Sequence, residues 1–248
     1  MQDSIVRFYD EAYTRDAREA QLYARWRALG AIGKADHLIA LCQRAALRPE
    51  SSLEVGCGDG ALLSELHSRG FGGRLAGVEI TQAAVEIARA RAEIDSVELY
   101  DGMHLRVADG AYDLGIVSHV LEHVPEPAAL LKEVARACRT VVFEVPLEAN
   151  LSARRAAKRE HAEEVGHLQR FDRAGARAIV ARAGLAIGGE LEDALPLEVH
   201  RFFASTPRAR SAASVKWAVR STLHGLAAPL ARRLFTVHYA CLCRRPGA

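Results

Sequence analysis

The sequence predicts an α/β fold, in which a parallel sheet carries helices on both faces. From about residue 50 onward, short apolar runs alternate with amphipathic stretches, which is typical of repeated β-α-β units. The first apolar run ends in a Gly-rich turn at 56–60, where a strand leads sharply into a helix. Residues 2–47 instead show apolar side chains at helical spacing. We therefore expect an N-terminal helical cap over residues 1–48 and one α/β domain over 49–248.

Composition excludes several classes of protein. The chain has 248 residues, of which 50% are apolar and 6% aromatic, so it is long enough for a sizeable and mainly aliphatic core. An odd number of cysteines without regular spacing argues against a disulfide framework and favours a reducing compartment. The first residues show no signal-peptide pattern, and no apolar run is long enough to span a membrane. We expect a cytoplasmic protein.

The cap is expected to be helical because its apolar side chains recur every three or four residues, as at Leu22, Trp26 and Leu29. Its aromatic side chains would suit a lid over a flat or apolar ligand; they are Phe8, Tyr9, Tyr13, Tyr23 and Trp26. Aromatic residues at helical spacing are more often buried in a core, so we expect only one or two of these to contact a ligand. Pro49 closes the cap.

Seven strands are expected from the apolar runs that follow Pro49, near 52–55, 74–79, 96–99, 112–118, 139–145, 185–192 and 236–243. Helices are expected between them, near 60–69, 81–93, 126–137 and 172–183. The third of these begins with Pro125 and Pro127, which suit a first turn, and the fourth has Asp172 as its candidate N-cap residue. Because strands and helices alternate, we expect parallel pairing with right-handed crossovers.

Two segments interrupt this alternation and are expected to form helical insertions. The first, near 147–170, is strongly charged, and the second, near 205–233, carries a one-sided apolar stripe. The stripe comprises Val215, Val219, Leu223, Leu226 and Leu230. We expect the stripe to pack on the domain. The alternative is a helix that lies on a membrane surface, because Trp217 and the flanking basic residues suit such an interface.

The Gly-rich turn predicts a binding site for a nucleoside cofactor. Gly56, Gly58 and Gly60 let the backbone approach a ligand closely and lead to the free N–H groups of a helix N-terminus. Glu79 ends the second apolar run, where its carboxylate can accept hydrogen bonds from both hydroxyl groups of a ribose. The pattern Gly56-x-Gly58-x-x-Ala61 also fits a dinucleotide site, so the glycine spacing alone does not identify the cofactor.

Three further features distinguish a dinucleotide site from a site for another nucleoside cofactor. Glu54 precedes the first glycine by two residues, Asp101-Gly102 follows the third expected strand, and the fourth continues into 112–124, YDLGIVSHVLEHV. The Tyr-x-x-x-Lys pair of short-chain dehydrogenases does not occur in the sequence. The motifs resemble those of class I S-adenosylmethionine (AdoMet)-dependent methyltransferases, specifically the small-molecule group called type 11. The resemblance covers about residues 50–190. It implies a Rossmann-like, seven-stranded methyltransferase sheet, with AdoMet as cofactor and S-adenosylhomocysteine as product.

The resemblance also implies a role for each motif residue in holding the cofactor. Glu54 would orient the glycine loop, and the backbone of Cys57 would pass beneath the methionine part of AdoMet. Glu79 would bind the ribose, while Ile80 would cover one face of the adenine. The remaining implied contacts come from Asp101 and Gly102 at the adenine edge, and from Ser118 and His119 near the sulfonium.

Three histidines are candidate general bases, since an imidazole can accept a proton near neutral pH. His119 directly follows the fourth expected strand, whereas His123, further along the same motif, could instead fix a turn. His167 belongs to a Gly-His element before the helix at 172–183. Glu122 and Glu144 lie near the same edge, and either could act on substrate or serve the structure. Because histidines suit hydroxyl deprotonation, we expect methyl transfer to oxygen, with nitrogen or carbon as alternatives.

The charge distribution leaves several partners open. No acidic residue follows Glu198, whereas these basic residues do: Arg201, Arg208, Arg210, Lys216, Arg220, Arg232, Arg233, Arg244 and Arg245. Such a segment suits an anionic substrate, a membrane surface or nucleic acid, or it forms a solvated helix face.

We favour a small-molecule acceptor. The alternatives are a lipid or quinone at a membrane surface, RNA bound through the basic C-terminal region, and a non-catalytic AdoMet- or NAD-binding protein. RNA is disfavoured because the sequence has no Asn/Asp-Pro-Pro-Tyr-like base-binding motif. We expect no bound metal, since the cysteines and histidines show no zinc spacing, and we expect a monomer or a homodimer.

Overall fold

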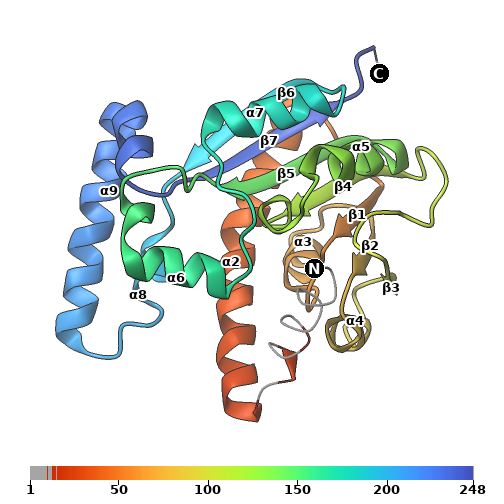
Figure 1. Cartoon of the computed structure of the whole chain (residues 1–248). Coiled ribbons are helices and arrows are strands. Elements are labelled where there is room, and N and C mark those ends of the chain that lie inside the picture. The colour runs from red at the N-terminus through yellow and green to blue at the C-terminus, as the bar shows by residue number, and fades with distance from the viewer. Residues whose placement is uncertain (1–9, 11–12, 15, 248) are drawn as a thin grey trace.

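A seven-stranded sheet with strand order β3-β2-β1-β4-β5-β7-β6 forms the centre of the molecule (Figure 1). The computed structural model describes residues 10, 13–14 and 16–247. The strands are β1 (Ser51–Val55), β2 (Arg74–Glu79), β3 (Ser96–Leu99), β4 (Tyr112–Ser118), β5 (Cys138–Pro146), β6 (Ala186–Asp193) and β7 (His238–Arg244). Each strand overlaps its predicted range, which confirms the seven-stranded α/β fold.

The sheet is mixed, and the expectation of a wholly parallel sheet is wrong for its last strand. Strands β1 to β5 pair in parallel, whereas β7 pairs antiparallel with both β5 and β6. The register places His238 opposite both Pro146 and Asp193, so β5 and β6 end where β7 begins. The chain therefore leaves β6 and re-enters the sheet at the same edge, which forces the antiparallel direction.

The helices lie between and beyond these strands. Those whose bounds fall within the described residues are α2 (Ala17–Arg44), α3 (Ala61–Ser68), α4 (Gln82–Arg89), α5 (Pro127–Ala137), α6 (Ala156–Glu164), α7 (Arg173–Arg182), α8 (Leu197–Arg201) and α9 (Pro207–Leu234). Two short 3₁₀ turns, η1 (Leu121–His123) and η2 (Ser152–Arg154), follow β4 and β5. Predicted helix starts are confirmed at α5, whose first residue is Pro127, and at α7, where Asp172 Oδ1 accepts the N–H of Gly175 at 2.7 Å.

Helices cover both faces of the sheet (Figure 1). On one face α5 and α7 pack through Leu131 and Ile179 into a core that includes Phe143 of β5. On the other face α2 and α3 pack through Leu38 and Leu66. Burial of such apolar side chains is the main force that holds the layers together.

Most of the cap residues that the structure describes form one long helix, α2, with Asp16 as its N-cap residue. Ala31, Ala35 and Leu41 of α2 are buried in the same cluster as strand residues, so this part of the cap shares a core with the sheet. Phe8 and Tyr9 lie outside the described residues. The division of the chain at residue 48 stays a prediction.

The two insertions are helical, as expected. The first contains η2 and α6, and the second is α9, which changes direction at Ala227, where the backbone is not helical, just before Pro229. Figure 1 shows α6, α8 and α9 gathered on the side of the molecule away from β3 and α4.

The apolar stripe of α9 does not pack on the domain as a whole, which corrects the expectation. Leu223 packs against the core, but Val215, Val219, Leu226 and Leu230 are between 47% and 84% exposed. The reason is that α9 stands off the sheet and contacts the domain mainly through α8 and its own C-terminal end. Among the described residues, no helix has the length and apolar character needed to cross a membrane.

Candidate active site

A cavity of about 980 Å³ lies at the carboxyl ends of β1, β2, β4 and β5. Glu79 and Ser118, the last residues of β2 and β4, line it together with Glu144 near the end of β5. The carboxyl edge of an open α/β sheet is where such folds bind ligands, because loops of several strands converge there. The volume is at the upper end of the range for small-molecule sites.

The glycine loop after β1 forms the floor of this cavity. Gly56 and Gly58 have positive φ angles of 74° and 54°, a conformation that favours glycine. The N–H groups of Gly56 and Cys57 both donate to Val78 O, at 2.8 and 3.1 Å, which ties the loop to β2. A Cβ atom on Gly56 would lie 2.5 Å from a methyl group of Val120, so a larger residue would push the loop out of place.

Glu79 is buried and holds the glycine loop through its carboxylate. Its Oε2 accepts the N–H of Gly58 at 2.8 Å, and its Oε1 accepts the N–H of Ile80 at 2.6 Å. Burial raises the pKa of Glu79, while the hydrogen bonds from Gly58, Ile80 and Thr81 act in the opposite direction. Each carboxylate oxygen keeps a second lone pair, so the group can still accept the hydroxyls of a ribose.

Glu54 Oε2 and Ser118 Oγ are buried polar atoms that line the cavity and have no hydrogen-bond partner among the described residues. Burial raises the pKa of Glu54 to about 8, because its charged form is poorly solvated. Unpartnered polar atoms inside a protein are costly, so these two atoms indicate places where a ligand would supply hydrogen bonds.

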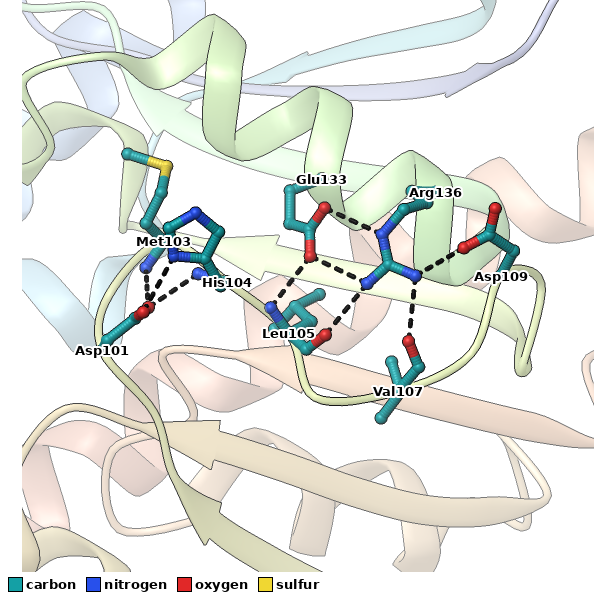
Figure 2. Close-up of polar contacts among 8 residues, drawn as sticks. All are labelled: Asp101, Met103, His104, Leu105, Val107, Asp109, Glu133 and Arg136. Carbon is teal, nitrogen blue, oxygen red and sulfur yellow. Dashed lines mark hydrogen bonds and ion pairs between the residues drawn. The ribbon is translucent and has the colours of Figure 1, made fainter.

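The loop between β3 and β4 contributes Gly102 and Met103 to the cavity wall, but Asp101 lies outside it. Figure 2 shows Asp101 Oδ1 accepting the N–H groups of Met103 and His104, at 2.8 and 2.7 Å. The Asp101 side chain therefore shapes the turn that presents Gly102 and Met103, and its predicted contact with adenine stays a prediction.

Arg136 of α5 anchors the rest of this loop (Figure 2). Its guanidinium donates to Leu105 O and Val107 O, both at 2.9 Å, and pairs with Asp109 and Glu133. A planar guanidinium with several donors suits this task, because it satisfies two backbone carbonyls and two carboxylates at once.

His119 follows β4 with a positive φ angle of 57°, an uncommon conformation for a non-glycine residue. The backbone N–H of His119 donates to the backbone carbonyl of Glu144 at 2.9 Å. Its ring nitrogens face two carboxylates, Nδ1 that of Glu122 at 3.1 Å and Nε2 that of Glu144 at 3.2 Å. Burial and Lys34 lower the pKa of His119, but the two carboxylates outweigh them and raise it. His119 is thus held between two negative charges.

Glu144 accepts hydrogen bonds from three histidines on three different elements. Besides His119, His37 of α2 lies 2.8 Å from Oε2, and His238 of β7 lies 3.1 Å from Oε1. Burial raises the pKa of Glu144, but the three histidines outweigh burial and hold it well below its usual range. Burial lowers the pKa of His37, whereas Asp193 and Glu144 bring it to about 10.

His123 and His167 form a second histidine group in the same cavity, with ring centres 4.8 Å apart. His123 Nδ1 lies 3.2 Å from Gly166 O, which is the turn-fixing contact considered from the sequence, and burial lowers its pKa. His167 Nδ1 lies 2.7 Å from Glu148 Oε2. That contact fixes the tautomer with hydrogen on Nδ1 and leaves Nε2 as an acceptor.

Two residue sets in the described part of the chain have the geometry of a metal site. The ligand atoms of His119, Glu144 and His238 lie within 4.8 Å of one another, as do those of Glu122, His123 and His167. Imidazole and carboxylate together suit zinc or iron. The expectation that the protein binds no metal stays a prediction.

The cap helix α2 supplies several side chains to the cavity. Trp26 of α2 and Tyr13, which precedes this helix, line the cavity, whereas Tyr23 does not; how many of the cap aromatics contact a ligand stays a prediction. Arg27 lies over the ring of Tyr13, 4.7 Å from its centre, and pairs with Asp59 at 2.8 Å.

The structure brings most of the predicted site residues together. Those that line the cavity are Glu54, Gly56, Cys57, Gly58, Glu79, Ile80, Gly102, Ser118, His119, His123 and His167. Gly60 does not; it caps α3, and a Cβ there would lie 2.5 Å from Ile94 Cδ1. Sequence reasoning missed His37, His238 and Glu148, because each is brought to the site only by tertiary packing.

The comparisons with known proteins now identify the family. A methyltransferase-domain family matches residues 23–188, which is more than half of the chain. The chain therefore belongs to the class I AdoMet-dependent methyltransferases. The resemblance seen in the sequence motifs is thereby confirmed.

Curated relatives match only part of this methyltransferase. The ubiquinone biosynthesis O-methyltransferase of Acinetobacter baylyi is 32% identical over 96 residues, which is 36% of this chain and 38% of that protein. The enzyme of the same name from Neisseria meningitidis serogroup C is 33% identical over 104 residues, 40% of this chain and 42% of that protein. The chain thus spans about two fifths of the length of these relatives.

Solved structures support the fold over nearly the whole chain. The geranyl diphosphate C-methyltransferase of Streptomyces coelicolor has a TM-score of 0.65 at 15% identity and covers 98% of this chain and 97% of its own. The [4+2]-cyclase SpnF has a TM-score of 0.58 at 16% identity, covering 84% and 80%. At such identities the likeness shows the fold alone, and a shared fold can host different reactions.

Proposed function

We propose that this methyltransferase transfers a methyl group from AdoMet to a small-molecule acceptor and releases S-adenosylhomocysteine. AdoMet supplies an electrophilic methyl group on a sulfonium centre. The observation that carries the proposal is that one cavity joins the glycine loop and the buried carboxylate of Glu79 to the histidines beyond β4. Membership of the methyltransferase family supports the same reaction.

The residues present fit the cofactor. The unpartnered Oε2 of Glu54 and Oγ of Ser118 are suited to polar atoms of its methionine part, and Glu79 is suited to the ribose hydroxyls. Tyr100 and Met103 provide an apolar wall beside Ile80 for the adenine. These residues bind and orient, which is the larger part of what a methyl transfer needs, because the leaving thioether is neutral.

Among the candidate bases, the geometry favours His167. Glu148 holds its Nδ1, so Nε2 is directed to accept a proton from an acceptor hydroxyl. His119 has both ring nitrogens opposite carboxylates, which suits a fixed wall of the cavity better than proton transfer. We therefore propose transfer to oxygen, the atom named in the ubiquinone-pathway relatives.

His167→Asn tests this assignment, with His67→Asn on the exposed side of α3 as the matched control. We expect His167→Asn to lower kcat by about 10²–10⁴-fold while AdoMet affinity stays unchanged, because general base catalysis contributes about that much. A kcat within about twofold of wild type would instead show that the acceptor needs no base at this position.

The exposed apolar residues of α9 favour a second candidate, an acceptor such as a lipid or quinone presented at a membrane surface. Val219 and Leu226 lie on a helix whose charged residues are all basic. Sedimentation with vesicles of phosphatidylglycerol and phosphatidylcholine tests this hypothesis. Protein that sediments with the vesicles supports an acceptor at a membrane surface, and protein that stays in the supernatant contradicts it. RNA remains the third candidate acceptor, through the same basic region.

The function itself is tested with AdoMet carrying a labelled methyl group and a cell extract divided into water-soluble, lipid and RNA fractions. Label entering the water-soluble fraction, and lost with Glu79→Ala, supports the small-molecule proposal. Label in the lipid or RNA fraction assigns the acceptor to that class. Absence of label from all fractions, although AdoMet binds, would favour a non-catalytic cofactor-binding protein.

We further propose that the protein acts in the cytoplasm as a monomer or homodimer. All five cysteines are free and buried, which is compatible with a reducing compartment. Light scattering of the purified protein distinguishes the two oligomeric states.

A further inference from the structure

The cavity extends from the cofactor residues to the helical insertions, where its lining becomes basic. Lys158 of α6 and Arg220 of α9 both line it, although they are far apart in the sequence. Figure 1 shows α6 and α9 on the same side of the sheet, beyond the end of β5. This end of the cavity lies away from the glycine loop, so it is available to the acceptor.

Further basic residues lie near this end of the cavity, and their charges lower one another's pKa. Burial lowers the pKa of Lys216, and the nearby charges of Arg220, Lys158 and Arg155 lower it further. Burial also brings the pKa of His200 to about 4, together with Arg220, Lys216 and Lys158. We call Arg155, Lys158, Lys216 and Arg220 the basic cluster.

The basic cluster has no counter-ion within the part of the chain that the structure describes. None of its four side chains takes part in an ion pair or hydrogen bond there. The guanidinium of Arg220 lies over the ring of Phe235, with its carbon 5.0 Å from the ring centre, but it pairs with no carboxylate among the described residues. The opposite end of the cavity differs, because Arg27 is paired there with Asp59.

Three carboxylates that line the cavity are already engaged with histidines. Glu148 pairs with His167, Asp193 with His37, and Glu144 with three histidines. Glu192 does reach α9, but it pairs there with Arg232 and not with the basic cluster. Like charges crowded without counter-ions destabilise a protein, so an external anion would relieve this repulsion.

We infer that the methyl acceptor carries a phosphate group, which the basic cluster binds while the acceptor's nucleophile faces His167. Lys158 and Arg220 line the cavity without a counter-ion among the described residues, and the exposed Arg155 and Lys216 add positive charge beside them. This charge suits a dianion better than a single carboxylate, and the guanidinium of Arg220 can hold two phosphate oxygens at once. This inference rests on the proposed function, since it names the class of acceptor for the same cavity.

The test measures binding of phenyl phosphate by tryptophan fluorescence, because Trp26 lines the cavity. We expect saturable binding to the wild type, weakened at least about tenfold in both Arg220→Gln and Lys158→Gln. Arg208→Gln, at the start of α9 and outside the cavity, should bind as the wild type does. AdoMet affinity should be equal in all four proteins, which shows that each is folded.

Other outcomes overturn the inference. A wild type that binds AdoMet but not phenyl phosphate, or Arg220→Gln and Lys158→Gln variants that bind it normally, would show that the cluster does not receive a phosphate. Equal binding of phenylacetate would assign the cluster to a carboxylate, and much tighter binding of a single-stranded oligonucleotide would assign it to nucleic acid. Failure of AdoMet binding would instead refute the proposed function, so the two failures are distinguishable.

Discussion

Replacing Glu79 by glutamine tests the cofactor end of the cavity, because both carboxylate oxygens of Glu79 accept a backbone N–H. Oε2 accepts from Gly58 at 2.8 Å and Oε1 from Ile80 at 2.6 Å. A glutamine amide has only one oxygen. Whichever way it turns, its NH₂ group faces one of these two N–H donors, and that donor loses its acceptor.

The expected magnitude follows from this loss. An unsatisfied buried donor costs about 1–3 kcal/mol, so Glu79→Gln should lower the free energy of unfolding by about that amount. The N–H group that loses its acceptor should also shift the glycine loop and weaken the contact to a ribose hydroxyl. If about the same 1–3 kcal/mol is lost from binding, the Kd for AdoMet should rise by about 5–150-fold, since about 1.4 kcal/mol corresponds to tenfold.

Urea unfolding and calorimetric titration with AdoMet measure the two quantities. Glu98→Gln is the matched control, because Glu98 lies exposed on the neighbouring strand β3 and does not line the cavity. If AdoMet affinity in Glu79→Gln equals that of the control, then Glu79 does not bind the ribose. If the unfolding free energy of Glu79→Gln also equals that of the control, the hydrogen bonds from Gly58 and Ile80 to Glu79 do not stabilise the loop.

Three further predictions concern residues around the cavity. The pKa of Glu54 is about 8 against an ordinary 4.5, so between these pH values the folded protein holds a proton that the unfolded chain has released. The unfolding free energy should therefore fall as pH rises through this window, by at most about 1.4 kcal/mol per pH unit, and Glu54→Gln should lose that contribution; identical slopes in urea titrations would contradict it. Gly77→Ala should cost about 1–3 kcal/mol, because its Cβ would lie 2.5 Å from Cys57 Sγ, and adding Cys57→Ala should recover part of the loss; an unchanged Tm in the single variant would refute the close contact. Arg136→Met should free the 101–109 loop, seen as faster proteolysis there and weaker AdoMet binding; an unchanged cleavage rate would show that the loop holds without Arg136.

The glycine-loop half of the cavity, which we propose holds the cofactor, was predictable from the sequence because its parts are local. Gly56 and Gly58 lie directly after a strand, and Glu79 ends the next one, so the order of strands alone brings them together. Positive φ angles at both glycines explain why the turn is recognisable as a motif.

The acceptor half was not predictable, since it depends on packing between distant segments. His37 reads as an ordinary polar position in a helix, yet it reaches Glu144, which is 107 residues away. His238 arrives at the site only because β7 runs antiparallel, and the alternation of strands and helices predicted the opposite direction. The stripe on α9 was expected to be buried, but most of it is exposed. Amphipathic spacing shows that a helix has an apolar face but not what covers that face.

The position of Glu144 has a consequence for how the protein is made. Its three imidazole partners come from α2, from the end of β4 and from β7, and β7 is the last strand in the described chain to be synthesised. A nascent chain that has not yet released β7 from the ribosome holds this carboxylate with at most two of its three partners. Glu144 can therefore gain its third imidazole partner only after translation has passed His238 and β7 has joined the sheet.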